Sequence, residues 1–214
     1  MSISQTNDNG GRIGVVFIDV LFAIVMGISA TEILGEPWYK QGPTFVWQSS
    51  FGFEMGVLLL GYATLITSWV GYHRSVGTIP QEIGTFSQWV TFVIDILLLA
   101  CYLLILTKFK DFGFVLVMLF LVFGLYVIWD IFHQRQRTSS DAESRQRMGV
   151  SRFWAVYFAL LLVAYCLLEL KDAIQVTVDW GFLSLAFAGI VLYRLHKKCL
   201  RLKSILDLLM FQRP

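Results

Sequence analysis

Six stretches of the chain are almost wholly apolar, and short polar connections separate them. Each is close to the length of about 20 residues that an α-helix needs to cross a hydrocarbon layer about 30 Å thick. The pattern predicts an all-α integral membrane protein with a short N-terminal tail, residues 1–12, and a six-helix transmembrane domain, residues 13–195. The expected spans are residues 13–34, 51–73, 86–107, 112–132, 153–170 and 180–195.

The polar segments show two further patterns. In residues 196–214, apolar side chains recur at a helical spacing and cations occupy the other face. This segment is expected to form an amphipathic cytoplasmic helix, either on the inner leaflet or against another subunit. Residues 133–151 lack such a periodicity and are expected to be a linker between the fourth and fifth spans.

The 17 Lys and Arg residues are divided unevenly between the two sides of the predicted membrane. One side receives all of them except Lys40, Lys108, Lys110 and Lys171. Because cytoplasmic loops carry an excess of Lys and Arg, both chain termini are expected in the cytoplasm, which requires an even number of spans. The tryptophans near span ends are expected at the headgroup level, namely Trp69, Trp89, Trp129, Trp154 and Trp180.

Composition narrows the classes of function. With 57% hydrophobic and 15% charged residues, the chain is too apolar for an ordinary soluble domain, and its short connections leave no room for a nucleic-acid-binding domain. The sequence contains no Ser/His/Asp grouping, Gly-rich phosphate loop, haem signature or His/Cys metal spacing. We therefore expect no enzyme, no cofactor and no metal site, and membrane lipids are the expected surroundings.

Two aspartates lie inside predicted spans, where a carboxylate costs roughly 2.5 to 3.5 kcal/mol on insertion scales unless it finds a partner or an aqueous path. Asp19 lies about 9 Å from the cytoplasmic edge of the first span, and Asp95 about 13 Å from that edge in the third. On the second span, Trp69 and His73 are four residues apart and share one face at a similar depth. Asp19 is therefore expected to accept hydrogen bonds from Trp69 or His73.

Several roles stay open for these groups. Asp19 and His73 are interpreted as an anchor of helix register, as part of gating or ion entry, or as carriers of a proton. Arg12 or Arg74 is expected beside them at the cytoplasmic rim. Asp95 is either a polar packing partner or part of an ion or proton path, because the sequence marks no neighbour for it.

The first span also has a face of branched and small side chains. Ile24 and Ile28 are one helical turn apart, and Ala23 and Gly27 keep the adjoining surface small, which lets helices approach closely. In copies of this helix arranged around an axis, the two isoleucines would form stacked apolar rings, and such constrictions gate conduction by dewetting. Packing against lipid or protein is the alternative interpretation.

The stretch that begins at Arg12, RIGVVFIDVLFAIVMGI, resembles the first helix of the lysosomal and prokaryotic transmembrane potassium channel family. That helix bears an Arg, then Phe-Ser-Asp, then an apolar pore-lining stretch. Phe17 and Asp19 match the motif, while Ile18 stands in place of its serine. The end of the second span, SWVGYHR, is similar to the family's Trp followed shortly by His.

This resemblance implies a homotetramer whose first helices line a pore for monovalent cations such as potassium. Ile24 and Ile28 would form the constriction, and Ala23 and Gly27 would allow close helix packing. The resemblance also implies a polar network that supports the pore helix, made of Arg12, Phe17, Asp19, Trp69 and His73.

The leading hypothesis is therefore an oligomeric cation channel. A proton-coupled transporter that uses Asp19, Asp95 and His73 as a relay is the first alternative. The second is a non-conducting membrane adaptor that acts through the arginine-rich segment 133–151 and the C-terminal helix.

Overall fold

Helices make up all the regular structure in the described part of the chain. The computed structural model describes residues 9–35, 49–76, 86–136, 142–170 and 176–211, and near several helix ends only the backbone is described. The helices are α1 (Asn9–Gly35), α3 (Ser49–Val76), α4 (Phe86–Thr107), α5 (Phe112–Gln136), α6 (Ala142–Glu169) and α7 (Val176–Phe211).

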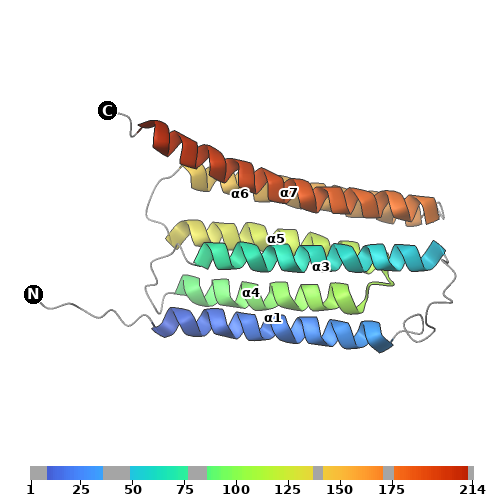
Figure 1. Cartoon of the computed structure of the whole chain (residues 1–214). Coiled ribbons are helices and arrows are strands. Elements are labelled where there is room, and N and C mark those ends of the chain that lie inside the picture. The colour runs from blue at the N-terminus through green and yellow to red at the C-terminus, as the bar shows by residue number, and fades with distance from the viewer. Residues whose placement is uncertain (1–8, 36–48, 77–85, 137–141, 171–175, 212–214) are drawn as a thin grey trace, which may run out of the picture.

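The helices run side by side and alternate in direction along one long axis (Figure 1). Helix α1 lies at one edge of the bundle and packs against α4 and α3. Helix α5 packs against α4 and α6, and α7 covers α6 and α3. The start of α1 and the end of α7 lie at the same end of the bundle (Figure 1), as an even number of helices in alternating directions requires.

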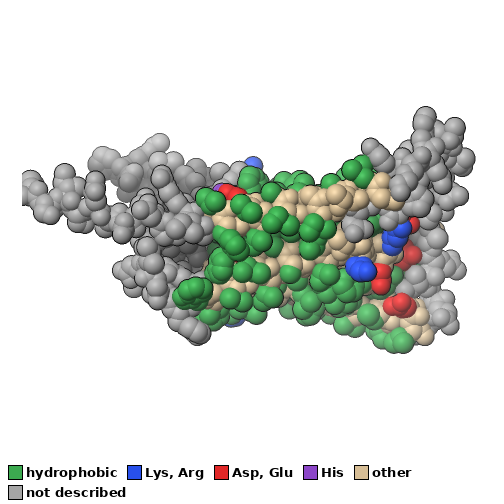
Figure 2. Space-filling view, turned by 90° about the horizontal axis from the view of Figure 1, so that it is seen from below, with side chains coloured by type: hydrophobic (Ala, Val, Ile, Leu, Met, Phe, Trp, Pro, Cys, Tyr) green, Lys and Arg blue, Asp and Glu red, His purple; other side chains and the backbone are tan. Residues whose placement is uncertain are grey.

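The helices match the dimensions of a bilayer. Five have apolar stretches long enough to cross it: Gly52–His73, Trp89–Thr107, Phe112–Phe132, Met148–Glu169 and Thr177–Cys199. In α1 the apolar stretch with described side chains, Val16–Thr31, is shorter, although the helix has 27 residues and is about 40 Å long. On the face seen in Figure 2, hydrophobic side chains form a broad belt, and the charged side chains of the described residues lie toward its two ends. The chain is thus a multi-pass helical membrane protein.

Glycines allow close contact between helices. A Cβ at Gly61 would lie 2.8 Å from Leu106 on α4, and a Cβ at Gly189 would lie 2.7 Å from the ring of Tyr157 on α6. Lipid tails are as apolar as leucine, so tight van der Waals packing rather than removal of apolar surface from water holds such helices together. These contacts set the spacing between α3 and α4 and between α6 and α7.

A side-chain cap positions α5 after the short turn that follows α4. The backbone N–H of Phe114 donates a hydrogen bond of 3.0 Å to Oδ1 of Asp111, the residue before the first turn of α5. Since the first N–H groups of a helix have no partner within it, this capping bond satisfies one of them. The turn aligns α4 with α5, the two helices that carry Asp95 and Trp129.

The helices extend further than the apolar pattern predicts. Residues 133–151 were expected to be a linker, but α5 continues to Gln136 and α6 already begins at Ala142. The cause is the composition of this segment, in which Gln, Arg, Glu and Ala favour helix and no proline interrupts it. The sixth span and the amphipathic segment likewise form one continuous helix, α7, and its side chains from residue 200 onward lie outside those described.

Candidate functional site

The first polar network joins α1 to α3 through Asp19. The indole Nε1 of Trp69 donates a hydrogen bond of 3.0 Å to Oδ1 of Asp19, and Nε2 of His73 lies 2.7 Å from the same oxygen. The expected contacts of this carboxylate with Trp69 and His73 are therefore present. The side chain of Asp19 is 40% exposed and that of His73 33%, so the network lies at the surface of the bundle.

Aromatic rings hold this network in place. Phe22, one turn after Asp19, stacks on Trp69 with 5.2 Å between ring centroids, and Trp69 packs edge-to-face on His73 at 4.6 Å. Phe17 contacts Phe92 on α4 at 5.5 Å. Such ring pairs add about 0.5–1.5 kcal/mol beyond the burial of their surface. Phe17 thus helps to attach α1 to α4, while the side chains of Arg12 and Arg74 lie outside those described.

A second contact attaches α1 to α3 further along. Ser29 is fully buried, and its hydroxyl lies 2.9 Å from the hydroxyl of Tyr62. Ser29 also donates to the carbonyl of Met26 at 3.0 Å, so Tyr62 donates to Ser29. Polar contacts at two levels therefore fix the rotation of α1 about its own axis.

That rotation turns the isoleucine face away from the rest of the chain. At 100° per residue, Ile24 and Ile28 lie about 140° and 180° around α1 from Asp19. Their side chains are 48% and 40% exposed. Ala23 is exposed as well, and no described atom outside α1 would come within 4 Å of a Cβ at Gly27. Small residues were expected to allow close packing here, and the described part of the chain supplies no partner for it.

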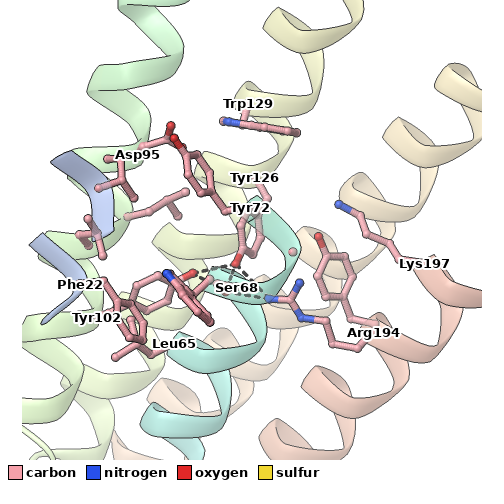
Figure 3. A pocket seen from close by; sticks show the side chains of 16 residues that line it. Phe22, Leu65, Ser68, Tyr72, Asp95, Tyr102, Tyr126, Trp129, Arg194 and Lys197 are labelled. Atoms are coloured by element: carbon pink, nitrogen blue, oxygen red, sulfur yellow. Dashed lines mark hydrogen bonds between the residues drawn. The ribbon is translucent and has the colours of Figure 1, made fainter. Parts of the chain in front are cut away.

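A cavity of about 140 Å³ lies inside the bundle (Figure 3). Side chains from all helices except α6 line it, and Asp95 and Arg194 lie toward opposite ends (Figure 3). Asp95 is only 8% exposed, and Trp129 of α5 is its hydrogen-bonding neighbour. Asp95 thus faces the interior of the protein and not lipid.

Three hydroxyl groups form a second network at the other end of the cavity. Tyr102 donates to Ser68 at 2.7 Å, and its oxygen lies 2.7 Å from that of Tyr126. Ser68 donates to the carbonyl of Thr64 at 2.7 Å and is also in hydrogen-bond contact with Tyr126. Arg194 donates through Nη2 to Ser68 at 2.7 Å and to Tyr126 at 3.3 Å. The network links α3, α4, α5 and α7.

Lys197 lies one turn beyond Arg194 and has a different partner. Its Nζ lies 3.6 Å from Oδ2 of Asp130, which also accepts a hydrogen bond from Ser151. The same ammonium lies 4.9 Å from the ring centroid of Tyr193. A carboxylate and an aromatic face thus compensate this cation.

The cavity and its hydroxyl network were not expected from the sequence. Trp129 was interpreted as a membrane-interface residue, and Arg194 and Lys197 only as charges that set topology. The available signal was the helical spacing of Arg194 and Lys197 on one face of α7. Their partners on α3 and α5 are distant in sequence, and no local pattern identifies them.

Comparison with known proteins gives no assignment. No known protein family matches the chain, and neither a curated protein nor a solved structure shows significant similarity to it.

Proposed function

We propose that the protein is an oligomeric cation channel whose α1 helices line the conduction path between copies. The observation that carries this proposal is the fixed rotation of α1. Asp19 and Ser29 attach one side of the helix to α3, and this leaves Ile24 and Ile28 on the opposite, exposed side. Isoleucines stacked around an axis would form the hydrophobic gate of a narrow pore.

The packing inside a single chain favours a conduction path between copies of the chain over a conduction path through one copy. Large side chains that are almost completely buried fill the centre of the bundle, among them Tyr193, Phe123, Phe158 and Leu106. Phe123 and Phe158 stack with 4.2 Å between ring centroids. The cavity of about 140 Å³ reaches only part of the way along the bundle, since its lining lies at residues 65–72 of α3 and 193–197 of α7, and close packing in the remainder leaves no room for a continuous column of water.

The motif resemblance supports the same assignment. Phe17 and Asp19 occupy the positions that resemble the pore helix of the potassium channel family, and Trp69 and His73 are the residues that contact Asp19. The proposal includes a homotetramer, permeation by monovalent cations, and six spans with cytoplasmic termini.

The experiment is cation flux through the purified full-length chain in liposomes with a potassium gradient. Wild-type protein is expected to release potassium, and Ile24→Asn is expected to raise the flux severalfold because a polar ring wets the constriction. Leu160→Asn is the matched control, since Leu160 is 64% exposed on α6 and lies away from the proposed path. Absence of flux in the wild type, or an equal rise in both variants, would contradict the proposal.

A proton-coupled transporter is the second candidate, and one observation favours it. Asp95 is a buried carboxylate that faces a cavity, an arrangement that proton-coupled transporters use. Proton-driven solute uptake that is lost in Asp95→Asn, without potassium flux in the same liposomes, would favour this function over the channel.

A further inference from the structure

Arg194 is a half-buried cation that lines the cavity, and it has no carboxylate partner among the described residues. A guanidinium stays ionised at any physiological pH, so its burial requires compensation by an anion or by oriented dipoles. The ion pairs of the described side chains join His73 to Asp19 and Lys197 to Asp130, and none of them includes Arg194. Two hydroxyl groups are its hydrogen-bond acceptors.

The neighbouring cation, Lys197, has a carboxylate partner, whereas Arg194 has none within the described part of the chain. Both cations lie on the same face of α7 and line the same cavity. Lys197 lies 3.6 Å from Asp130, whereas the carboxylate that lines the cavity with Arg194, Asp95, lies toward its other end (Figure 3). Arg194 lies 5.3 Å from the ring centroid of Tyr193 and 5.8 Å from that of Tyr126, but no carboxylate of the described side chains is within ion-pair distance of it.

Arg194 also keeps donor capacity that the protein does not use. A guanidinium has five N–H groups, and Nη2 makes both of its hydrogen bonds to hydroxyls. Its Nε is buried and has no hydrogen-bond partner within the described residues. Gly71 leaves room for the group, because a Cβ there would lie 3.1 Å from Nη1.

The neighbouring hydroxyl hydrogens are already committed. Ser68 donates to Thr64 and Tyr102 donates to Ser68, so the single hydroxyl hydrogen of Tyr126 goes to Tyr102 or to Ser68, while its oxygen accepts from Arg194. A ligand at this end of the cavity would therefore meet the guanidinium of Arg194 and, one helical turn away, the ammonium of Lys197, which is already paired with Asp130. Arginine binds carboxylate and phosphate oxygens well through its planar fork of N–H groups, and here Nη1 is the open part of that fork, because both hydrogens of Nη2 are donated to hydroxyls and Nε is buried.

We propose that the cavity is an anion-binding site in which Arg194 holds a carboxylate or phosphate group. The volume of about 140 Å³ is below the range of about 300–1,000 Å³ typical of pockets for drug-sized ligands, so the ligand is a small molecule or one end of a larger one. Apolar walls such as Phe22 and Leu65 favour a short hydrocarbon body. Asp95 at the far end of the cavity would repel a second negative charge on the ligand. This site does not depend on whether α1 lines a pore.

The same chemistry has two sources, a free anion in water or the headgroup of an anionic lipid. The experiment measures thermal unfolding of the full-length protein in neutral detergent. One arm adds sodium butyrate or sodium phosphate, with sodium chloride at equal ionic strength as reference. The other arm adds phosphatidylglycerol, with phosphatidylcholine as reference. A ligand that binds the folded state raises Tm in a saturable way.

We expect a saturable rise in Tm with the free anions, with phosphatidylglycerol, or with both, and the responding arm identifies the source. Arg194→Gln removes the charge and is expected to abolish the rise. Arg152→Gln, at an exposed arginine of α6, is the matched control and is expected to keep it. Arg194→Lys keeps the charge without the fork and is expected to weaken binding at least about tenfold.

Three results would overturn the site. One is the absence of a saturable rise with every probe in the wild type. The second is an equal rise in wild type and Arg194→Gln, which would indicate general salt or lipid effects. The third is wild-type affinity in Arg194→Lys. This variant decides the question if Arg194→Gln is not monodisperse after purification.

Discussion

At the scale of single residues, Asp19 determines how α1 is attached. Its Oδ1 contacts both the Trp69 indole and the His73 imidazole of α3, and Phe22 covers the indole. Hydrogen bonds to a charged group contribute about 1.5–3 kcal/mol each, and partial exposure of Asp19 to water reduces that value. One carboxylate thus supplies much of the polar attachment of an edge helix.

Replacement of this carboxylate should destabilise the protein. Asp19→Ala is expected to lower the free energy of unfolding by about 1–3 kcal/mol, because two donors lose their acceptor. Asp19→Asn keeps one acceptor oxygen and is expected to cost less. The measurement is reversible denaturation in detergent followed by tryptophan fluorescence. Glu169→Ala, at an exposed carboxylate, is the control, and an equal effect of both alanine variants would contradict this role of Asp19.

Sequence allowed the first network to be predicted but not the second. Trp69 and His73 are four residues apart at the depth of Asp19, so simple helix geometry brings the three together. Arg194 is separated from Ser68 by 126 positions and its surroundings come from four helices. Its contacts depend on the lateral order of the helices, which the hydropathy of the chain does not encode.

At the scale of elements, glycines determine how closely the helices pack. Gly189 faces Tyr157, whose ring is held because its hydroxyl donates to the carbonyl of Leu185 at 2.9 Å. The ring therefore has little freedom to move away from an added methyl group. Gly124, in contrast, has no described atom within 4 Å of a Cβ built on it.

This contrast predicts opposite effects of the same substitution. Gly189→Ala is expected to lower the free energy of unfolding by about 1–3 kcal/mol through overpacking. Gly124→Ala is expected to leave it unchanged or raise it by up to about 1 kcal/mol through better helix propensity. Both are measured by thermal or denaturant unfolding in the same detergent. If Gly189→Ala proves as stable as Gly124→Ala, the close contact between α6 and α7 is wrong.

The helices themselves were predictable where apolar runs match the bilayer thickness, as in α4 and α5. Their ends were less so. Helix α6 begins at Ala142 and α7 continues to Phe211, since polar residues that favour helix extend both elements beyond their apolar stretches. Hydropathy locates the part of a helix in the membrane, whereas capping and propensity locate its ends.

At the scale of the whole molecule, the bundle has an edge helix with one attached and one exposed side. Helix α1 contacts α3 and α4, and its face with Ile24 and Ile28 has no partner within the described chain. The five other helices form a packed unit around buried aromatic rings. An assembly of several copies with α1 at the centre would bury this face and make it a pore lining.

The central claim is that Ile24 faces the conduction path. Its most direct test is chemical modification of Ile24→Cys in protein carrying Cys166→Ala and Cys199→Ala, since these are the exposed native cysteines of the described chain and Cys101 is buried. Potassium flux from liposomes is measured before and after a water-soluble, cationic thiol reagent. The account predicts that modification blocks flux through Ile24→Cys and leaves Leu160→Cys unaffected. Unchanged flux after confirmed labelling of Ile24→Cys would contradict it.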